Sequence, residues 1–356
     1  MNWPNRMLCA LVAALNAACP GDDTDDGATD GGKDGDTGPA AWQVVLDAGD
    51  LDRAVLSVWG AGPSDVYAVG GPLGNSGFET LAVHFDGTAW RALAPGGTET
   101  FWWVSGSGPK DVWMVGTEGR IAHWDGTKFT PHDSGTTATL WGVWAASPSD
   151  AWIVGGTPEG GTSKPNDIVL HWDGSTWSPV AVPMPLGRAF FKMWGASSDD
   201  LYVVGEAGTI WHKKASTWAL EANEPPLAMD RLFTVNGCNA TEIYAVGSRD
   251  VLESDGATWK KLDVELTNDV NGVACNAPGE VAIVGFGGLK QRLVAGAWID
   301  EFDVEPFTGL HAVWADGAGT FWAVGGDFVS GAAAGKPREG VVARYGKGTV
   351  ADTVGK

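Results

Sequence analysis

Seven near-copies of one short apolar segment constrain this chain more than any other feature. Each copy reads as a strand that ends in Val-Gly, and the first is VYAVG at residues 66–70. The others are VWMVG (112–116), AWIVG (151–155), LYVVG (201–205), IYAVG (243–247), VAIVG (281–285) and FWAVG (321–325). From Gly70 to Gly325 they span 255 residues in six intervals, a mean of roughly 42. That period is typical of propeller blades of four short strands and is too long for leucine-rich repeats.

A second motif follows four of these segments. It reads LHWDGSTW at 170–177, with near-copies VHFDGTAW (83–90), AHWDGTKF (122–129) and LESDGATW (252–259). The pattern predicts a third strand, a turn and a fourth strand, in which Asp and Gly occupy the two left-handed positions of a two-residue hairpin.

Two further positions recur at fixed places in the unit. Eleven residues before each terminal glycine lie Trp59, Ser105, Trp144, Trp194, Asn236, Ala274 and Trp314, which indicates a first hairpin of constant length. An acidic residue precedes the second strand in six units: Asp65, Asp111, Asp150, Asp200, Glu242 and Glu280. We interpret these carboxylates as acceptors for free backbone amides in the turn.

The aromatic residue of the fourth strand is displaced in the last unit. It recurs as Trp90, Phe129, Trp177, Trp218, Trp259 and Trp298, but the seventh unit reaches the C-terminus without one. AAWQVVL at 40–46 looks like a fourth strand without a third, so Trp42 completes the last blade. We therefore predict an all-β, seven-bladed propeller of four-stranded antiparallel blades over 42–350, closed by this N-terminal strand and followed by a C-terminal tail at 351–356.

The segment before the propeller has a different composition. Residues 1–19 have one Arg, an apolar run from Met7 to Ala14 and small residues before Cys19, which is the layout of a secretory signal. LNAAC resembles the lipobox of bacterial lipoproteins, whose cysteine is lipidated, although Asn16 replaces the usual apolar residue; ordinary cleavage is the alternative. The Asp- and Gly-rich stretch over 20–41 is predicted to be a disordered acidic tether.

The VWAVG and HWDGTxW style of these repeats resembles the Trp-rich propeller repeats of predicted lipoproteins from myxobacteria and related Gram-negative bacteria. More distantly it is similar to the Asp-box repeats of sialidase-like propellers, although Gly directly follows Asp here and His generally replaces the usual Ser. The resemblance covers about residues 42–350. It implies the fold and, with the N-terminal segment, an exported protein at the outer membrane, in the periplasm or on the cell surface.

Composition and residue placement argue against several functions. The formal net charge of −21 opposes nucleic-acid binding, which needs clustered Lys and Arg. His84, His123, His171 and His212 share one repeat position, one per blade, so they lie too far apart to bind one metal ion. We interpret each histidine as a structural hydrogen-bonding residue within its blade, paired with the aspartate two residues later, as in His171 and Asp173. We expect no metal and no cofactor.

Catalysis is the least favoured function. A sialidase-like glycoside hydrolase would need a tyrosine nucleophile and three converging arginines, but Tyr67, Tyr202 and Tyr244 belong to the second-strand repeat. The arginines are scattered, and no GxSxG, HExxH or Walker motif is present. We expect a non-catalytic monomer that binds an envelope or extracellular protein or a surface polymer, with the membrane contacted only through the lipid anchor. Carbohydrate binding by exposed tryptophans is the alternative.

Insertions point to a binding face. Connections between the second and third strands are long in units one, three and seven, and all seven emerge on one face of the disc. Their charged and polar residues are our candidates for binding: Asn75, Glu79, Lys164, Asn166, Asp167, Asp327, Lys336, Arg338 and Glu339. Drift in unselected surface loops is the alternative.

Two of the four cysteines lie in neighbouring units. If Cys19 is lipidated and Cys9 is lost with the signal, Cys238 and Cys275 remain, near the ends of the first strands of blades five and six. Export permits a disulfide between them, although they occupy adjacent rather than identical repeat positions.

Overall fold

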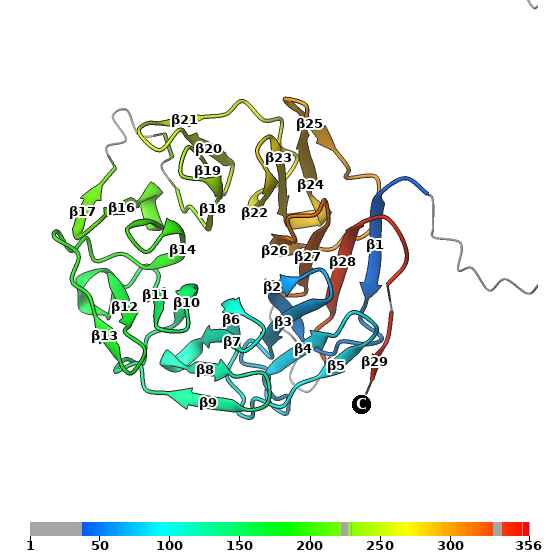
Figure 1. Cartoon of the computed structure of the whole chain (residues 1–356), viewed down its shortest axis with the longest axis horizontal. Coiled ribbons are helices and arrows are strands. Elements are labelled where there is room, and N and C mark those ends of the chain that lie inside the picture. Colours follow the sequence, from blue (N-terminus) through cyan, green and yellow to red (C-terminus); the bar gives the residue numbers. More distant parts are fainter. Residues whose placement is uncertain (1–37, 222–226, 229, 330–336, 351, 356) are drawn as a thin grey trace, which may run out of the picture. The chain divides into compact units, whose positions relative to one another are not determined.

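Each Val-Gly segment forms the second strand, counted from the centre, of one of seven antiparallel sheets arranged in a ring (Figure 1). This is the predicted seven-bladed propeller. The computed structural model describes residues 38–350 and 352–355, except 222–226, 229 and 330–336. In blade one, Val66 and Ala68 pack toward blade seven and Tyr67 and Val69 toward blade two. Because both faces of this strand are covered, its sequence is a continuous apolar run without alternation.

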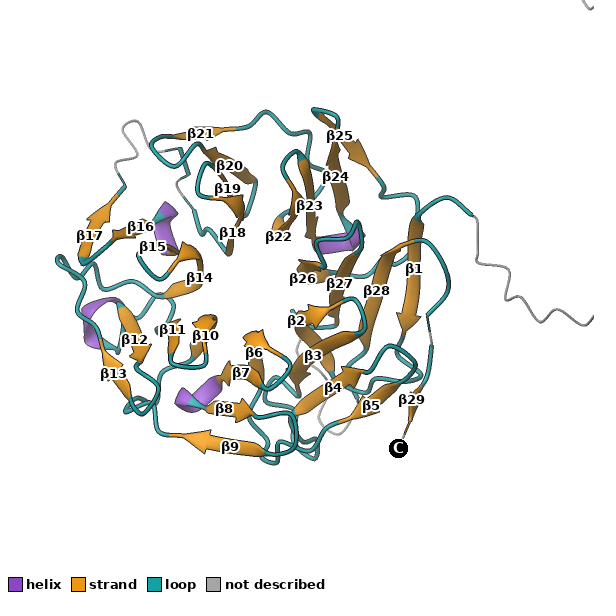
Figure 2. Cartoon of the chain, viewed as in Figure 1, coloured by secondary structure: helices purple, strands orange, loops and turns teal. Residues whose placement is uncertain are grey.

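The blades follow one another around the ring in chain order, and Figure 2 colours their strands, loops and short helical turns by secondary structure. Blade one has β2 (Ala54–Gly62), β3 (Asp65–Gly71), β4 (Leu81–Phe85) and β5 (Trp90–Ala92). Blade two has β6 (Phe101–Gly108), β7 (Asp111–Gly116), β8 (Ile121–Trp124) and β9 (Phe129–His132). Blade three has β10 (Leu140–Ser147), β11 (Asp150–Gly155), β12 (Ile168–Trp172) and β13 (Trp177–Pro179). Blade four has β14 (Phe190–Ser197), β15 (Asp200–Gly205), β16 (Ile210–Lys214) and β17 (Thr217–Leu220).

The remaining blades repeat the pattern. Blade five has β18 (Thr234–Asn239), β19 (Glu242–Gly247), β20 (Asp250–Ser254) and β21 (Trp259–Lys261). Blade six has β22 (Val270–Ala277), β23 (Glu280–Gly285), β24 (Lys290–Val294) and β25 (Ala297–Asp300). Blade seven has β26 (Leu310–Ala315), β27 (Phe321–Gly326), β28 (Gly340–Gly346) and β1 (Ala41–Leu46). Short 3₁₀ turns are η1 (Thr117–Gly119), η2 (Gly161–Ser163), η3 (Glu206–Gly208) and η4 (Phe286–Gly288). No helix in these described ranges is long and apolar enough to cross a membrane.

The ring is closed by β1, as the displaced tryptophan predicts. β1 pairs antiparallel with β28, and Trp42 lies opposite Tyr345. The Trp42 side chain is buried, and its indole Nε1 donates a hydrogen bond of 2.6 Å to Glu301, which follows β25 of blade six. The N-terminal strand therefore completes blade seven and also contacts its neighbour.

The C-terminal tail contributes a strand that the sequence did not predict. β29 (Val354–Gly355) pairs in parallel with β5 on the outer edge of blade one. Blade one consequently has five strands.

Glycine recurs at the anchor position of the second strands for a steric reason. A Cβ atom on Gly70 would collide with the carbonyl of Ala54, and one on Gly116 would collide with that of Thr100. In each case the carbonyl belongs to the start of the first strand or the residue before it, so only glycine permits the two backbones to approach this closely.

The Asp-Gly turn differs from the predicted hairpin. In blade one, Gly87 has a left-handed φ of 90°, but Asp86 is not among the positive-φ residues. The carboxylate of Asp86 instead accepts hydrogen bonds from the amides of Thr88 and Ala89, and Asp125 and Asp173 do the same in their blades. Hydrogen bonds from the hydroxyls of Thr127 and Ser175, together with these amide bonds, lower the pKa of Asp125 and Asp173 to about 2. The turn is therefore a four-residue loop ordered by its aspartate.

Candidate binding site at one mouth of the central channel

The first strands of all seven blades line a central channel, and its two mouths differ in their side chains. First strands begin, and second strands end, on the same side of the ring; we call that side the cup face. The three long connections start and end on it: residues 72–80 after β3, 156–167 after β11, and the described residues 327–329 and 337–339 after β27.

Aromatic side chains surround the mouth of the channel on the cup face. Many of them come from one repeat position, three residues before the Trp59 position and in the first strand or directly before it. This position holds Leu56, Trp102, Trp141, Phe191, Phe233, Asn271 and His311. Five of these are aromatic, and the loops add Phe286 from η4 and Phe328 from the connection after β27. We name Trp102, Trp141, Phe191, Phe233, Phe286, His311 and Phe328 the aromatic cup. They line a cavity of about 270 Å³ together with Pro158, Lys192, Arg231, Thr234, Asn271 and Val329.

The rings of the cup form one continuous series of contacts. Trp102 lies 4.6 Å from Trp141 and 5.7 Å from His311, measured between ring centroids. Phe191 lies 5.9 Å from Trp141 and 5.6 Å from Phe233. On the other side, His311 contacts Phe328 at 5.2 Å, and Phe328 in turn contacts Phe286 at 5.5 Å. Because each ring contacts the next, the cup is formed before any ligand arrives.

Polar groups at the base of the cup already have partners in neighbouring blades. The Lys192 ammonium donates to the carbonyl of Trp141 at 2.7 Å, and Thr234 Oγ1 donates to that of Asn271 at 2.6 Å. Asn271 Nδ2 donates to Leu310 at 2.9 Å. His311 Nδ1 donates to the carbonyl of Leu56 at 2.5 Å.

Burial affects the protonation of two of these groups. It lowers the pKa of His311 to about 3, assisted by the charge of Lys192, and lowers that of Lys192 to about 7. The indole Nε1 of Trp102 is buried and has no hydrogen-bond partner in the described part of the chain. The cup therefore offers apolar surface and few free polar atoms.

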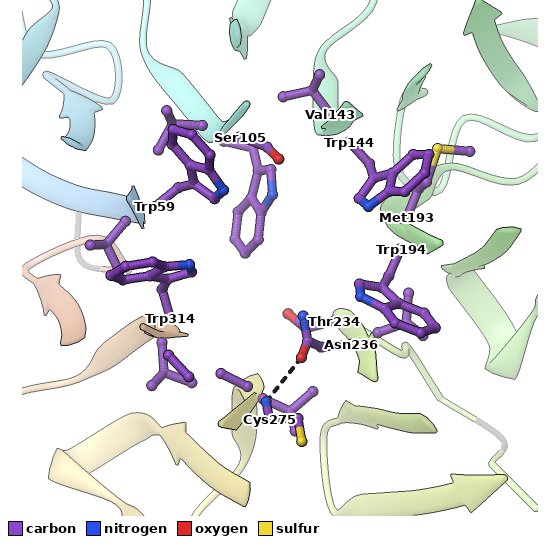
Figure 3. A pocket seen from close by; sticks show the side chains of 18 of the residues that line it. Trp59, Ser105, Val143, Trp144, Met193, Trp194, Thr234, Asn236, Cys275 and Trp314 are labelled. Atoms are coloured by element: carbon purple, nitrogen blue, oxygen red, sulfur yellow. Dashed lines mark hydrogen bonds between the residues drawn. The ribbon is translucent and has the colours of Figure 1, made fainter. Parts of the chain in front are cut away.

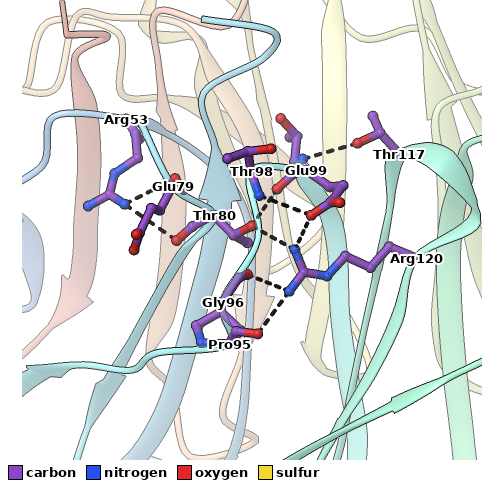
Figure 4. A network of polar contacts seen from close by, with 10 residues as sticks. Arg53, Glu79, Thr80, Pro95, Gly96, Thr98, Glu99, Thr117 and Arg120 are labelled. Carbon is purple, nitrogen blue, oxygen red and sulfur yellow. Dashed lines mark hydrogen bonds and ion pairs between the residues drawn. The ribbon is translucent and has the colours of Figure 1, made fainter. Parts of the chain in front are cut away.

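A second hollow adjoins the cup. It has a volume of about 600 Å³ and is lined by residues 73–78, 98–100, 117 and 118 and by Trp102, which the two hollows share. A polar network beside it holds the loops of blades one and two (Figure 4). Within it the Arg120 guanidinium contacts the Glu99 carboxylate at 2.5 Å and Thr80 Oγ1 at 2.8 Å. We call this second hollow the side groove.

Sequence candidates in the connection after β11 mostly stabilise that loop. Asn166 Nδ2 donates to the carbonyls of Gly161 and Gly187, and its Oδ1 accepts from the amide of Thr157 at 2.7 Å. The Asp167 carboxylate accepts from the amide of Gly187 at 2.6 Å. Lys164 is exposed. The loop reaches the cup through Pro158, which was not a candidate.

The candidates in the connection after β3 lie beside the side groove. Asn75 lines it and is buried, whereas Glu79 is exposed and its main-chain carbonyl accepts a hydrogen bond from Arg53.

In the connection after β27, Arg338 is buried and donates to the carbonyls of Pro72 and Asp327. Asp327 is half-buried and Glu339 is exposed, while Lys336 lies outside the described residues. The structure thus places the described candidates on one face but does not bring them together around one pocket. The aromatic cup is the feature that sequence reasoning missed, although the aromatic position three residues before Trp59 was visible in the repeat.

The opposite mouth of the channel is built from the Trp59 position (Figure 3). Four tryptophans there lie against a glycine of the next blade: Trp59 on Gly106, Trp144 on Gly195, Trp194 on Gly237 and Trp314 on Gly60. Where the next blade has Ala145, Cys275 or Ala315 in place of that glycine, the preceding blade has Ser105, Asn236 or Ala274 instead of tryptophan. Tryptophan is therefore present only where a missing side chain leaves room for it.

One of the junctions without tryptophan contains a disulfide. Cys238 of blade five is joined to Cys275 of blade six, with Cα atoms 5.2 Å apart. Asn236 Oδ1 also accepts a hydrogen bond of 2.9 Å from the amide of Cys275.

The recurring histidines bond to a different aspartate from the one expected. His84, His123, His171 and His212 contact the aspartate that opens the second strand of their own blade, at 2.5 to 2.9 Å. The aspartate that opens the second strand, such as Asp150, therefore bonds to the histidine rather than to the turn amides as we expected. In blades one to three, the aspartate two residues after the histidine, such as Asp173, accepts the amide hydrogen bonds of the following turn. His171 lies opposite Trp152, so Asp150, two residues earlier on the same face of the neighbouring strand, is within its reach, whereas Asp173 lies in the turn beyond the end of β12.

Each of these histidines also packs against the aromatic residue of the second strand, with ring centroids 4.0 to 4.3 Å apart; His84 and His212 stack on their tyrosines, and the other two pairs are tilted. Burial lowers the pKa of His212, but hydrogen bonds to Glu221 and Asp200 raise it overall.

The described ranges show no cluster of metal ligands, and the three tyrosines of the second-strand repeat have raised pKa values. No group of three or more His, Cys, Asp or Glu there is placed to hold a metal ion. Burial and nearby carboxylates raise the pKa of Tyr67, Tyr202 and Tyr244, which is opposite to what a nucleophile requires.

Comparison with known proteins identifies the fold. No protein-family model and no curated protein matches the chain. Solved propellers match it over most of its length, among them YCF48 bound to D1 peptide, with 14% identity, a TM-score of 0.63 and coverage of 85% of this chain and 96% of that one. The WD40 β-propeller domain of Doa1 matches with 10% identity, a TM-score of 0.63 and coverage of 85% and 97%. A catalytically inactive virginiamycin B lyase from Staphylococcus aureus with quinupristin has 10% identity, a TM-score of 0.64 and coverage of 85% and 99%.

Proposed function

We propose that this protein is a non-catalytic binding propeller that holds an apolar segment of a partner protein in the aromatic cup. The observation that carries the proposal is the cup itself: seven ring side chains around a cavity of about 270 Å³, five of them anchored at the starts of the first strands. Aromatic residues in well-packed pockets supply most of the binding energy in protein interfaces. The side groove, which shares Trp102, would accept the chain that flanks the apolar residue.

A protein ligand fits the cup better than a sugar does. Sugars present several hydroxyls that each need hydrogen-bond partners, but Thr234, Asn271 and His311 already bond to backbone carbonyls, and Lys192 uses one of its three donor hydrogens in the same way. The apolar wall and the shortage of free polar atoms favour an apolar side chain. YCF48, a propeller of the same fold, is described in complex with a peptide, which supports this class of partner.

Panning a phage-displayed peptide library against the folded propeller tests this proposal. We expect enriched peptides to share an aromatic or large aliphatic residue and to lose at least about tenfold in affinity for Phe233→Ala or Trp141→Ala. Ile299→Ala is the matched control, because Ile299 is an exposed apolar residue on the outer strand β25. Each variant is first checked for an unchanged melting temperature.

Two outcomes would contradict the proposal. Peptides that bind both cup variants with wild-type affinity would place the site elsewhere. Glycan-array hits that depend on Phe233, with no enriched peptide, would favour a carbohydrate-binding propeller.

We also propose export and anchoring through Cys19, on the basis of the signal-like residues 1–19 and the acidic stretch before the propeller. Expression in a Gram-negative host with labelled palmitate tests this. Label in the wild-type protein and none in Cys19→Ala is the expected result. Export with no label in either protein would favour ordinary cleavage.

A further inference from the structure

A lysine lies at the base of the aromatic cup. Lys192 is in β14, next to Phe191, and its side chain is 4% exposed. The blades carry Ser57, Trp103, Gly142, Thr234, Gly272 and Ala312 at the same repeat position, so blade four alone has a charge there. The Lys192 Nζ atom lies 4.3 Å from the centroid of the Trp103 ring, and its hydrogen bond to Trp141 uses one of three donor hydrogens.

Within the part of the chain that the structure describes, this ammonium group has no carboxylate partner. No ion pair involves Lys192 among the residues that the structure describes, and its titratable neighbour is His311 of β26. Burying a charge without a counter-charge is costly. In accordance with this, burial lowers the pKa of Lys192 to about 7.

The other cation that lines the cup is different. Arg231 lies at the cup and pairs with Glu159, whose side chain is largely exposed. Its charge is therefore already compensated, and Lys192 is the cup cation that has no carboxylate partner among the described residues.

We propose that the ligand of the cup is a carboxylate carried on an apolar body, with the carboxylate paired to Lys192 and the apolar part held by the rings. This inference rests on the proposed function, because it takes the cup as the binding site. A cavity of about 150 Å³ holds one benzene molecule, so about 270 Å³ has room for a ring and a short acid arm. The carboxylate could belong to the C-terminal residue of a partner polypeptide or to a small free acid.

Calorimetric titration with two matched pairs of probes tests the inference. The first pair is 3-phenylpropionate and 3-phenylpropanamide. The second is acetyl-Gly-Gly-Phe with a free carboxylate or with a carboxamide. We expect the acid to bind at least about tenfold more tightly than the amide in the pair that resembles the natural source, since about 1.4 kcal/mol of charge pairing corresponds to that factor.

Two further measurements isolate Lys192. Lys192→Met should remove the preference for the acid, whereas Lys128→Met, at an exposed lysine in the turn between β8 and β9, should keep it. In the wild-type protein, the acid should lose affinity between pH 7 and pH 9, and its binding at pH 8 should take up protons from the buffer.

The outcomes separate the two proposals. Equal binding of acid and amide by the wild-type protein, without proton uptake, overturns the carboxylate but keeps the cup, and this comparison does not need a folded Lys192→Met. If no probe of either pair binds, the cup itself is not the ligand site. Binding of the peptide acid alone identifies a polypeptide terminus, and binding of phenylpropionate alone identifies a small acid.

Discussion

The two mouths of the channel are built from the same seven first strands, at repeat positions three residues apart. The residue types at these two positions nevertheless have different physical causes. At the Trp59 position the residue type depends on the next blade, because tryptophan occurs only where a glycine faces it. At the Leu56 position, on the cup face, no such rule applies: the side chains include Leu56, two tryptophans, two phenylalanines, Asn271 and His311. One mouth is thus explained by packing between blades.

The cup face is also where the extra residues are. The connections after β11 and β27 bring Pro158 and Phe328 to the cup, and η4 brings Phe286. A repeat position that packing explains needs no ligand. A position that varies from blade to blade and is supplemented by loops is a better candidate for binding. The comparison teaches that tryptophan content alone does not locate a site in such a protein.

Removing the closing strand should have the largest effect and should abolish both mouths together. Deletion of residues 38–46 exposes blade seven and removes the buried side chains of Trp42, Val45 and Leu46. We expect a loss of about 5 kcal/mol or more in the free energy of unfolding, measured by urea denaturation. Truncation after residue 350, which removes β29, is the matched control and should cost far less, because β29 pairs through only Val354 and Gly355. Equal losses would show that closure by β1 is not special.

Reduction should weaken the mouth opposite the cup at its junction without tryptophan. The Cys238–Cys275 disulfide closes a loop with a sequence separation of 37 residues. Its removal should lower the free energy of unfolding by about 3 kcal/mol, measured by denaturation with and without dithiothreitol. The double variant Cys238→Ser/Cys275→Ser should be insensitive to the reductant. A wild-type protein equally insensitive, with two titratable thiols, would remove the disulfide from this account.

Adding one methyl group should test the pairing of tryptophan with glycine. A Cβ on Gly237 would lie 2.5 Å from Cη2 of Trp194, and its three nearest atoms all belong to that ring. We expect Gly237→Ala to cost about 2 kcal/mol through overpacking, and to cost much less when Trp194 is already alanine. Gly62→Ala is the control, since no atom lies within 4 Å of its Cβ position. Thermal unfolding of the wild type, Gly237→Ala, Trp194→Ala and the double variant measures the coupling energy between the two residues. Additive losses of stability would mean that the tryptophan and the glycine do not restrain each other.

Measured per pH unit, the smallest effect concerns acid and belongs to the cup face. Burial lowers the pKa of His311 to about 3, so between about pH 6.5 and 3 the unfolded chain binds a proton that the folded chain does not. Stability should therefore fall as the pH falls through this window, by at most about 1.4 kcal/mol per unit from this residue. His311→Gln retains a donor for the Leu56 carbonyl and should show a shallower decline in urea titrations at each pH. Parallel curves for the two proteins would assign the acid sensitivity to other groups.

Much of the fold was predictable from the sequence because it depends on local, repeated patterns. The Val-Gly anchors, the constant first hairpin and the displaced Trp42 are visible as spacings, and they determined the number of blades and the way the ring closes. Details of side-chain bonding were less predictable. The histidines bond to the aspartate of the neighbouring strand, and the Asp of the turn binds amides, because strand pairing decides which groups meet.

The candidate site shows the limit of sequence reasoning most clearly. Loop lengths indicated a face, and the structure places the long connections on one face, but Asn166, Asp167 and Arg338 bond within the scaffold. The sequence by itself determined a ring of seven blades, since each blade repeats one pattern of apolar and turn residues. Only the tertiary structure decided that Trp102, Phe233, Phe328 and Lys192 share one cavity, because contacts between residues so distant in the chain follow from the closure of the ring and leave no local pattern.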